Sequence, residues 1–343
     1  MASRVEYRVG VGLSSYFWYV RGVPGGPDRP FSLTLIGGFL GAGKTTLLSR
    51  LLSEQQGLRL GVLVNDFGSL HLDAELIEEV RGGVMRLSNG CICCTLHSDL
   101  VSSLFQLIER GEVDHAIIET SGISDLRVLV RSFQDLERQG LLRLDGVISV
   151  VDAERFPLSQ GEDRVLLEGQ LQAADLVVLN KVELVGEEAL TSLEAEIQRI
   201  APRARRLRTS FGAVPLDLML GIEATDRGVG VPIHEHHHHQ GPAHAHFSTW
   251  SFVEEAPLSW KALAPILAQL PSEIVRAKGV LQLVERPDDR MLLQVVGARV
   301  HVRTLEKKAE KPRSEIIFIG RGADRVEESL RPKLLACRVG APS

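Results

Sequence analysis

Residues 38–45 have the residue types and the spacing of a phosphate-binding loop. They read Gly-Phe-Leu-Gly-Ala-Gly-Lys-Thr, between the strand-like run SLTLI and the helix-like run TTLLSRLLSEQ. In such a loop the glycines let backbone N–H groups point at phosphate oxygens, the lysine reaches the β- and γ-phosphates, and the threonine hydroxyl binds Mg²⁺. We therefore predict that the chain binds a nucleoside triphosphate and Mg²⁺ through Lys44 and Thr45. The loop glycines are Gly38, Gly41 and Gly43.

Two acidic residues are further candidates for the phosphate end of this site. Glu119 ends the apolar run HAIIE, and Gly122 follows three residues later. An acidic residue at the end of a buried strand can hold Mg²⁺ through water, and the glycine suits a loop that senses the γ-phosphate. Asp66 lies in the turn 65–68, where it either contacts Mg²⁺ or positions water, or only caps the turn. The candidate catalytic residues are Lys44, Glu119 and Asp66.

A base-recognition element is predicted at residues 180–183, which read Asn-Lys-Val-Glu at the end of the run DLVVLN. Guanine-specific GTPases place Asn-Lys-x-Asp here, and the carboxylate accepts hydrogen bonds from guanine N1–H and the exocyclic amine. Adenine has no N1–H, so the carboxylate would lose its partner. We therefore predict that Asn180, Lys181 and Glu183 bind the base and favour GTP over ATP. Glu183 stands where Asp is usual, which lengthens the side chain by one methylene.

Three cysteines, Cys91, Cys93 and Cys94, lie within four residues. Thiolates at this spacing can converge on one soft or borderline ion such as Zn²⁺, Cu⁺ or Co²⁺. Three sulfurs leave one tetrahedral position for His, a carboxylate, water or a partner's group, which suits a site that must release its metal. His97 is either that fourth ligand or a surface histidine. The cysteines could instead be a redox pair or buried thiols, and Cys337 is expected to be a small buried apolar residue.

Seven of the eleven histidines lie in one irregular internal tract. Neutral imidazoles can collect Zn²⁺, Ni²⁺ or Co²⁺ loosely. The other interpretation is a solvated linker whose histidines bind nothing. Because the chain already carries a cysteine cluster, we favour loose metal recruitment. The histidines are His234, His236, His237, His238, His239, His244 and His246.

The order of apolar runs predicts the fold class. Short strand-like runs alternate with longer segments, which indicates an α/β P-loop NTPase domain with a mainly parallel, doubly wound sheet. Residues 186–200 have the apolar spacing of an amphipathic helix. Several strand-like runs and two helix-like runs near the C-terminus predict a smaller α+β domain. The predicted boundaries are 1–30 for a disordered leader, 31–220 for the nucleotide domain, 221–247 for a His-rich linker, 248–336 for the second domain and 337–343 for a tail.

The composition of the chain limits which binding partners and which cellular compartment we expect. The net charge of −5 gives no electrostatic reason to expect nucleic acid. The basic run at residues 203–208 is interpreted as a solvated helix end or turn, in preference to a patch that binds phosphate or a partner. No apolar run has the ~18 residues that a membrane span needs, and the N-terminus lacks the features of a secretory signal. We therefore expect a cytoplasmic protein without a membrane partner.

The order of these motifs resembles that of the CobW-type metallochaperone GTPases, relatives of the urease and hydrogenase accessory GTPases. The Cys-x-Cys-Cys between the phosphate loop and Glu-x-x-Gly is highly specific to this family. Asp66 and Ser69 stand where Glu is common in the family, which argues against an auxiliary carboxylate metal site. Leu126 replaces a usual Pro. The matching segments are 37–48, 65–68, 89–100, 119–125, 150–153 and 180–184, with 276–279 and 317–324 in the smaller domain.

The resemblance implies roles for these residues. Residues Gly41, Ala42, Gly43, Lys44, Thr45 and Thr46 would bind nucleotide, Thr45 and Glu119 would serve Mg²⁺, and the three clustered cysteines would bind the cargo ion. It also implies that nucleotide state gates metal affinity.

The sequence therefore predicts a slow GTPase that loads a divalent metal, with Zn²⁺ favoured, and transfers it to a client metalloprotein. A homodimer that depends on nucleotide is compatible with this interpretation. Alternatives are a Co²⁺ chaperone for cobalamin synthesis, an activator of a nitrile-hydratase-type client, and a metal buffer without turnover. A nucleotide kinase shares the phosphate loop but gives the cysteine cluster no role.

Overall fold

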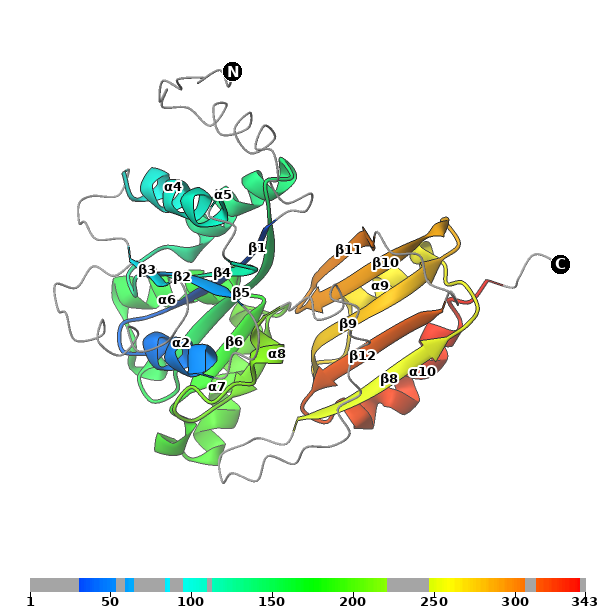
Figure 1. Ribbon diagram of the computed structural model, residues 1–343. Coiled ribbons are helices and arrows are strands. Elements are labelled where there is room, and N and C mark those ends of the chain that lie inside the picture. The colour runs from blue at the N-terminus through cyan, green and yellow to red at the C-terminus, as the bar shows by residue number, and fades with distance from the viewer. Residues whose placement is uncertain are drawn as a thin grey trace, which may run out of the picture.

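The described part of the chain folds into two domains that lie side by side (Figure 1). The computed structural model describes residues 31–53, 59–64, 84–86, 95–109, 113–220, 247–305 and 313–339, with the backbone alone for 84–86, 95–99, 103 and 109.

The first domain is built on a parallel sheet. Within the described residues seven strands pair in the order β3-β2-β4-β1-β5-β6-β7, and each of these pairings is parallel. Strands β1, β4, β5 and β6 are buried along their whole length, which is why they read as continuous apolar runs in the sequence. The strands are β1 Phe31–Gly38, β2 Leu60–Val64, β3 Val84–Arg86, β4 His115–Glu119, β5 Leu142–Asp152, β6 Leu176–Asn180 and β7 Arg205–Arg208.

Helices cover both faces of this sheet. Helices α4 and α5 pack on one side of β1 and β4, and α6 and α7 continue that layer over β5 and β6. Helix α2 packs on the opposite face with α8. The predicted helix at 186–200 is confirmed as α7. The helices are α2 Lys44–Ser53, α4 Thr95–Glu109, α5 Leu126–Arg138, α6 Gly161–Ala173, α7 Glu187–Ile200 and α8 Leu216–Met219, with 3-10 turns η1 Phe156–Leu158 and η2 Val182–Leu184.

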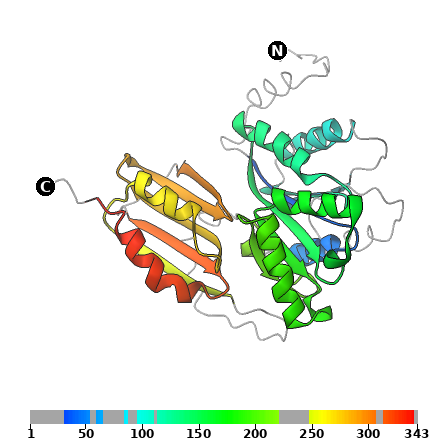
Figure 2. The ribbon, with the colours of Figure 1, turned by 180° about the vertical axis from the view of Figure 1, so that it is seen from behind.

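The second domain is an antiparallel sheet with its helices on one face. Its described strands pair in the order β11-β10-β9-β12-β8, and Figure 2 shows α9 and α10 lying over the back of that sheet. Phe252, Phe318 and Leu263 belong to the core between them. The predicted fold class, a parallel α/β domain followed by a smaller α+β domain, is confirmed. The elements are β8 Ser248–Glu254, α9 Trp260–Ala268, β9 Ile274–Leu283, β10 Arg286–Val296, β11 Arg299–Leu305, β12 Ser314–Gly320, η4 Ala323–Val326 and α10 Glu327–Leu335.

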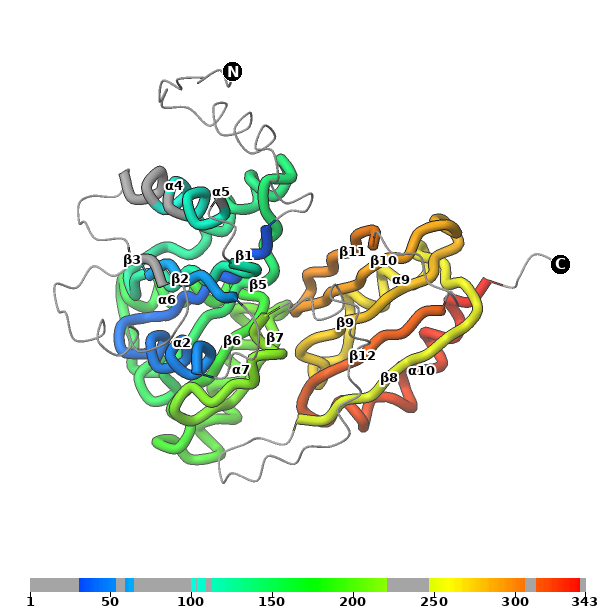
Figure 3. The backbone as a smooth tube through the Cα atoms, in the orientation of Figure 1, coloured from blue at the N-terminus to red at the C-terminus, as the bar shows by residue number. Residues whose placement is uncertain are grey.

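The prediction of a helix end or turn for the basic run at 203–208 is wrong. Its last four residues form β7, the edge strand that lies beside β6 in Figure 3. Leu207 is buried in the core, while Glu187 and Glu194 of α7 accept hydrogen bonds from Arg208. Neutralised guanidinium groups and one buried leucine therefore allow a strand where the basic composition suggested solvent.

Part of the contact between the two domains lies near the amino ends of β5 and β6. Asp145 of β5 and Arg276 of β9 form a fully buried ion pair with an Oδ2–Nη2 distance of 3.0 Å. Asp175, just before β6, accepts a hydrogen bond from Arg299 Nε at 3.0 Å. The nucleotide motifs lie at the carboxyl ends of these strands, at the opposite edge of the sheet. None of the described helices is long and apolar enough to span a membrane.

Candidate functional site

The phosphate loop connects β1 to α2 and folds around its own lysine. Lys44 is buried, and its Nζ donates hydrogen bonds to the carbonyl oxygens of Gly38 at 2.9 Å and Phe39 at 3.2 Å. Lys44 also begins α2, so the positive end of that helix faces the loop. A phosphate group placed here would meet both the ammonium and the helix N-terminus.

The loop glycines are required by close approaches of other chain segments. Gly38 has a φ of 139°, and a Cβ there would lie 2.2 Å from the carbonyl oxygen of Val150. Gly43 has a φ of 100°, and its Cβ would lie 2.3 Å from Asn180 Nδ2. Side chains at these two positions would both strain the backbone and displace the neighbouring strands.

Thr45 and Glu119 come together beside the loop. The Thr45 hydroxyl donates a hydrogen bond to Glu119 Oε1 at 3.0 Å, and Glu119 is buried at the carboxyl end of β4. Two hard oxygen groups in contact fit the donor set that Mg²⁺ prefers. The buried hydroxyls of Thr120 and Ser121 have no hydrogen-bond partner among the described residues. Buried unpartnered donors beside a phosphate loop fit a site whose ligand supplies acceptor oxygens.

The loop after β4 packs directly on the phosphate loop. A Cβ at Gly122 would lie 2.6 Å from the backbone nitrogen of Leu40. Gln170 of α6 donates from Nε2 to the carbonyl oxygens of Gly122 and Ser124, both at 3.2 Å. Gln170 belongs to none of the sequence motifs, although a glutamine on the buried face of a helix is a signal that it holds a polar loop.

Asn180 ties the predicted base-recognition element to the phosphate loop. Its Nδ2 donates to the Ala42 carbonyl at 2.9 Å, and its Oδ1 accepts from the Gly212 N–H at 3.0 Å. Lys181 has a φ of 62°, and its Nζ forms an ion pair with Asp152 Oδ2 at 2.7 Å. Glu183 is exposed in η2.

Asp152 and Gly212 are two residues of this region for which the sequence predicts no role. Asp152 ends β5 and also accepts the backbone N–H groups of Glu154 and Arg155 at 3.0 and 3.1 Å. It lies in the segment 150–153 that carries the family resemblance, so its position was visible in the sequence but its partner Lys181 was not. Gly212 follows β7, which was not predicted as a strand.

The structure brings together predicted nucleotide residues from three segments, 38–46, 119–122 and 180–183, but several predicted sites lie outside the described residues. Thr46 lies in the first turn of α2 with an exposed side chain. Asp66, the three clustered cysteines, the His97 side chain and the histidine tract are not among the described residues. No group of three or more His, Cys, Asp or Glu that could hold a metal occurs in the described part of the chain. Cys337 is buried, as expected, and burial raises the pKa of its thiol.

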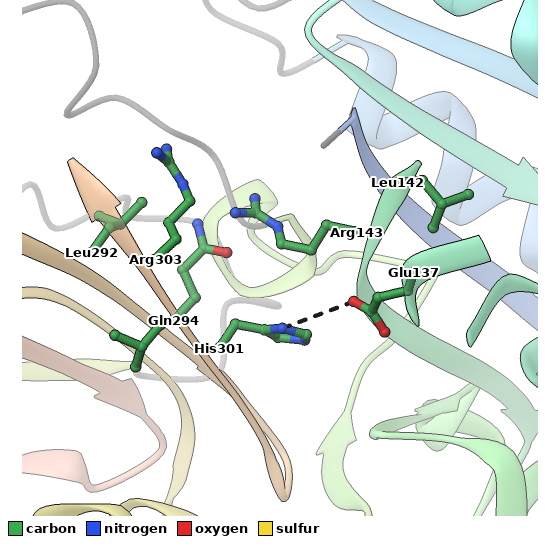
Figure 4. Close-up of a pocket in the computed structure, with 8 residues that line it drawn as sticks. Glu137, Leu142, Arg143, Leu292, Gln294, His301 and Arg303 are labelled. Carbon is green, nitrogen blue, oxygen red and sulfur yellow. Dashed lines mark ion pairs between the residues drawn. The ribbon is translucent and has the colours of Figure 1, made fainter. Parts of the chain in front are cut away.

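A separate cavity of about 220 Å³ lies between the domains, at the amino end of β5 (Figure 4). Arg143, Arg303 and His301 line it together with Glu137. His301 Nδ1 lies 3.9 Å from Glu137 Oε1. Burial, together with the charges of Arg299 and Arg143, lowers the pKa of His301 to about 4. The cavity is therefore a domain-contact feature, distinct from the phosphate loop at the other edge of the sheet.

Two family descriptions match the chain. Residues 32–208 match the CobW/HypB/UreG nucleotide-binding domain, and residues 247–338 match the cobalamin synthesis protein cobW C-terminal domain. The chain belongs to the CobW/HypB/UreG family. The predicted family resemblance is confirmed over both domains.

Relatives of known name cover most of the chain. It is 34% identical to the zinc chaperone CobW of Pseudomonas aeruginosa, over 89% of this chain and 91% of that protein. It is 30% identical to the zinc chaperone YjiA of Escherichia coli, over 85% and 94%. The zinc-regulated GTPase metalloprotein activator 1 of Dictyostelium discoideum is 32% identical, over 79% and 66%. A crystal structure of zinc(II)-bound YjiA GTPase from E. coli matches 91% of this chain and 100% of that chain at 25% identity, with a TM-score of 0.44.

Proposed function

We propose that this chain is a GTPase that loads a divalent transition metal, with zinc favoured, and transfers it to a client metalloprotein. The contact between Thr45 and Glu119 beside the phosphate loop carries the proposal, because it pairs the two oxygen groups that a nucleotide-bound Mg²⁺ needs. Relatives in the same family are named zinc chaperones and a zinc-regulated GTPase metalloprotein activator, and these names support the proposed binding and transfer of a metal.

The phosphate end of the site would work through groups of this chain. Lys44 would exchange its two carbonyl partners for oxygens of the β- and γ-phosphates. The backbone N–H groups of residues 41–46 would hold the phosphates, and Thr45 and Glu119 would hold Mg²⁺, which supplies charge neutralisation when bound. Asp66 would position the attacking water.

Base choice would depend on residues 180–183. Asn180 is held between the phosphate loop and Gly212, and Lys181 is held by Asp152, so this element is fixed from both sides. Glu183 is exposed and able to accept hydrogen bonds from guanine N1–H and the exocyclic amine. A carboxylate at this position favours GTP over ATP because adenine leaves it without a donor.

Metal transfer would use the cysteine cluster. Cys91, Cys93 and Cys94 lie in the sequence between Asp66 and Glu119, two residues that we assign to the γ-phosphate end of the site. GTP would order these segments and bring the thiolates together, and hydrolysis would loosen them. The histidine tract, at residues 234–246, would recruit metal loosely before it reaches the cysteines.

Two alternatives keep part of this proposal. A cobalt chaperone keeps the enzyme and changes the cargo, since thiolates accept both ions. A metal buffer keeps the cysteines and removes turnover.

In the proposed assembly, the domains span residues 31–220 and 248–336 with the His-rich linker between them, and two copies associate when nucleotide is bound.

An anaerobic metal titration in the presence of GTP, GDP or ATP tests the proposal, with the bound metal identified by elemental analysis. We expect zinc to be bound more tightly with GTP than with GDP, and ATP to give no such effect. Equal metal affinity in the GTP and GDP states would overturn the coupling. Metal delivery that survives Lys44→Ala would favour the buffer instead.

A further inference from the structure

Arg321 is a side chain through which the second domain contacts the edge strand of the first. It follows β12 and stands between Gly320 and Gly322. A Cβ at Gly320 would lie 1.8 Å from the carbonyl oxygen of Glu273, and Gly322 has a φ of 72°. Both positions therefore need glycine, and together they fix the backbone from which Arg321 extends.

Arg321 binds the end of β7. Its Nη2 donates a hydrogen bond to the carbonyl oxygen of Arg208, the last residue of that strand, at 3.0 Å. β7 pairs with β6 on one side and is the edge of the described sheet. An edge strand leaves carbonyl groups that need partners from outside the sheet, and Arg321 supplies one. The next residue, Thr209, donates its N–H to the Leu179 carbonyl of β6 at 2.7 Å.

The segment after this contact, residues 209–213, is here named the base loop. The Thr209 hydroxyl closes it with a hydrogen bond to the Ala213 carbonyl at 2.7 Å. The Gly212 N–H then donates to Asn180, whose amide donates to the Ala42 carbonyl of the phosphate loop. A continuous line of hydrogen bonds and backbone therefore leads from Arg321 to the predicted nucleotide site.

The base loop also carries an exposed aromatic residue in a strained conformation. Phe211 is 61% exposed and has a φ of 56°, in the left-handed region that non-glycine residues rarely adopt. Such strain persists where surrounding contacts enforce it, and it is concentrated at ligand sites. Phe211 is therefore an exposed, strained residue directly before Gly212, which holds Asn180.

The charges around Arg321 act on its guanidinium in opposite directions. Burial lowers the pKa of the Arg321 guanidinium, and the neighbouring Arg208 adds to that effect. Glu194 offsets the repulsion, since it accepts hydrogen bonds from Arg208 Nε at 2.7 Å and Nη2 at 2.8 Å. The ring of Phe247 lies 5.9 Å below the Arg321 guanidinium carbon. Arg321 is thus packed between an aromatic ring and a neutralised arginine, with the Arg208 carbonyl as its acceptor.

We propose that Arg321 is a positioning residue for base recognition: it holds the base loop, and through it Asn180, in the arrangement that selects guanine. The second domain therefore contributes to nucleotide affinity without touching the nucleotide. This inference rests on the proposed function, because it requires that residues 180–183 bind a guanine base.

The experiment compares Arg321→Ala, Arg321→Lys and the matched control Arg331→Ala. Arg331 is also an arginine over an aromatic ring, Trp250 at 5.5 Å, and it also donates to a backbone carbonyl, that of Ser251 at 3.1 Å. Its acceptor lies within the second domain. The measured quantities are the dissociation constants of GDP, inosine diphosphate and ADP for the full chain, together with its thermal unfolding.

We expect Arg321→Ala to weaken GDP binding roughly tenfold, the scale of one charge-assisted hydrogen bond, and to reduce the preference for GDP over inosine diphosphate. Arg321→Lys should retain part of the GDP affinity and part of the base preference. Arg331→Ala should leave both quantities unchanged, whatever its effect on thermal unfolding. If Arg321 had a purely structural role, Arg321→Ala would lower the fraction of active protein without changing the preference for GDP over inosine diphosphate. That result would overturn the inference. A wild-type chain that does not prefer GDP to ADP would instead overturn the proposed GTP specificity.

Discussion

Gly43 and Asn180 are so close that a Cβ on the glycine would lie 2.3 Å from the asparagine Nδ2. They are 137 positions apart in the sequence, in the phosphate loop and at the end of β6. The asparagine cannot move aside freely, because its amide is bonded to Ala42 on one side and to Gly212 on the other. The phosphate end and the base end of the site are therefore built on one contact.

We predict that Gly43→Ala weakens GDP binding by roughly thirtyfold or more. The new methyl group would displace Asn180 and break two hydrogen bonds of about 1 kcal/mol each, and tenfold in affinity corresponds to about 1.4 kcal/mol. Equilibrium binding of GDP measures the effect. Gly140→Ala is the matched control, since Gly140 also has a positive φ, 73°, but a Cβ there meets nothing within 4 Å. Similar losses in both variants would assign the effect to backbone strain alone.

Glu119→Gln should make nucleotide binding and hydrolysis less responsive to Mg²⁺. The amide keeps the size of the side chain and can still accept from Thr45, but it lacks the negative charge that favours a divalent ion. We expect the Mg²⁺ concentration for half-maximal GTP hydrolysis to rise roughly tenfold, about 1.4 kcal/mol. Glu137→Gln, which removes a carboxylate at the interdomain cavity, serves as control. An unchanged Mg²⁺ titration would remove Glu119 from the metal site.

The sequence predicted those parts of the site that depend on a local motif. The phosphate loop, Glu119 and Asn180 each lie at the end of a buried apolar run, and parallel strands place such ends at one edge of a sheet. Their convergence therefore followed from strand order and motif spacing. The family and the two-domain fold class followed from the same order of motifs.

The parts that were missed depend on contacts between distant segments. Gln170 and Asp152 hold Gly122 and Lys181, and neither partner can be read from spacing along the chain. The basic run before Thr209 resembles a solvated segment in the sequence, because the carboxylates that neutralise it lie on α7. Asp145 and Arg276 were not recognised as partners, since charged residues in apolar runs do not reveal their counterions.

We expect the contributions of Asp145 and Arg276 to the free energy of unfolding to depend strongly on each other. Burial works to raise the pKa of Asp145, but Arg276, His115 and Arg143 outweigh it and hold that pKa well below its usual range. Asp145→Asn would leave the fully buried guanidinium of Arg276 without its counterion, which costs about 3–5 kcal/mol of unfolding free energy. Urea unfolding of the single variant measures this loss.

The double variant Asp145→Leu with Arg276→Met separates loss of charge pairing from loss of packing. Because it removes both charges, we expect it to be more stable than Asp145→Asn. Arg313→Ala is a surface control, since Arg313 is half exposed where it pairs with Glu315, and it should change stability by less than about 1 kcal/mol. A double variant that is no more stable than the single one would show that shape, rather than charge, dominates the interface.

His301 should make the stability of the folded chain depend on pH between about 6.5 and 4. Burial, then Arg299 and Arg143, lowers the pKa of His301 to about 4, from 6.5 in the unfolded chain. The unfolded state therefore binds the proton first as pH falls, so stability is full above pH 6.5 and declines towards pH 4, by up to ~3 kcal/mol. His301→Gln should flatten this part of the curve of unfolding free energy against pH, while carboxylates elsewhere keep their own dependence below it. If wild type and variant give parallel curves across that window, His301 is protonated normally in the folded state, and the domain contact at the cavity does not exclude its charge.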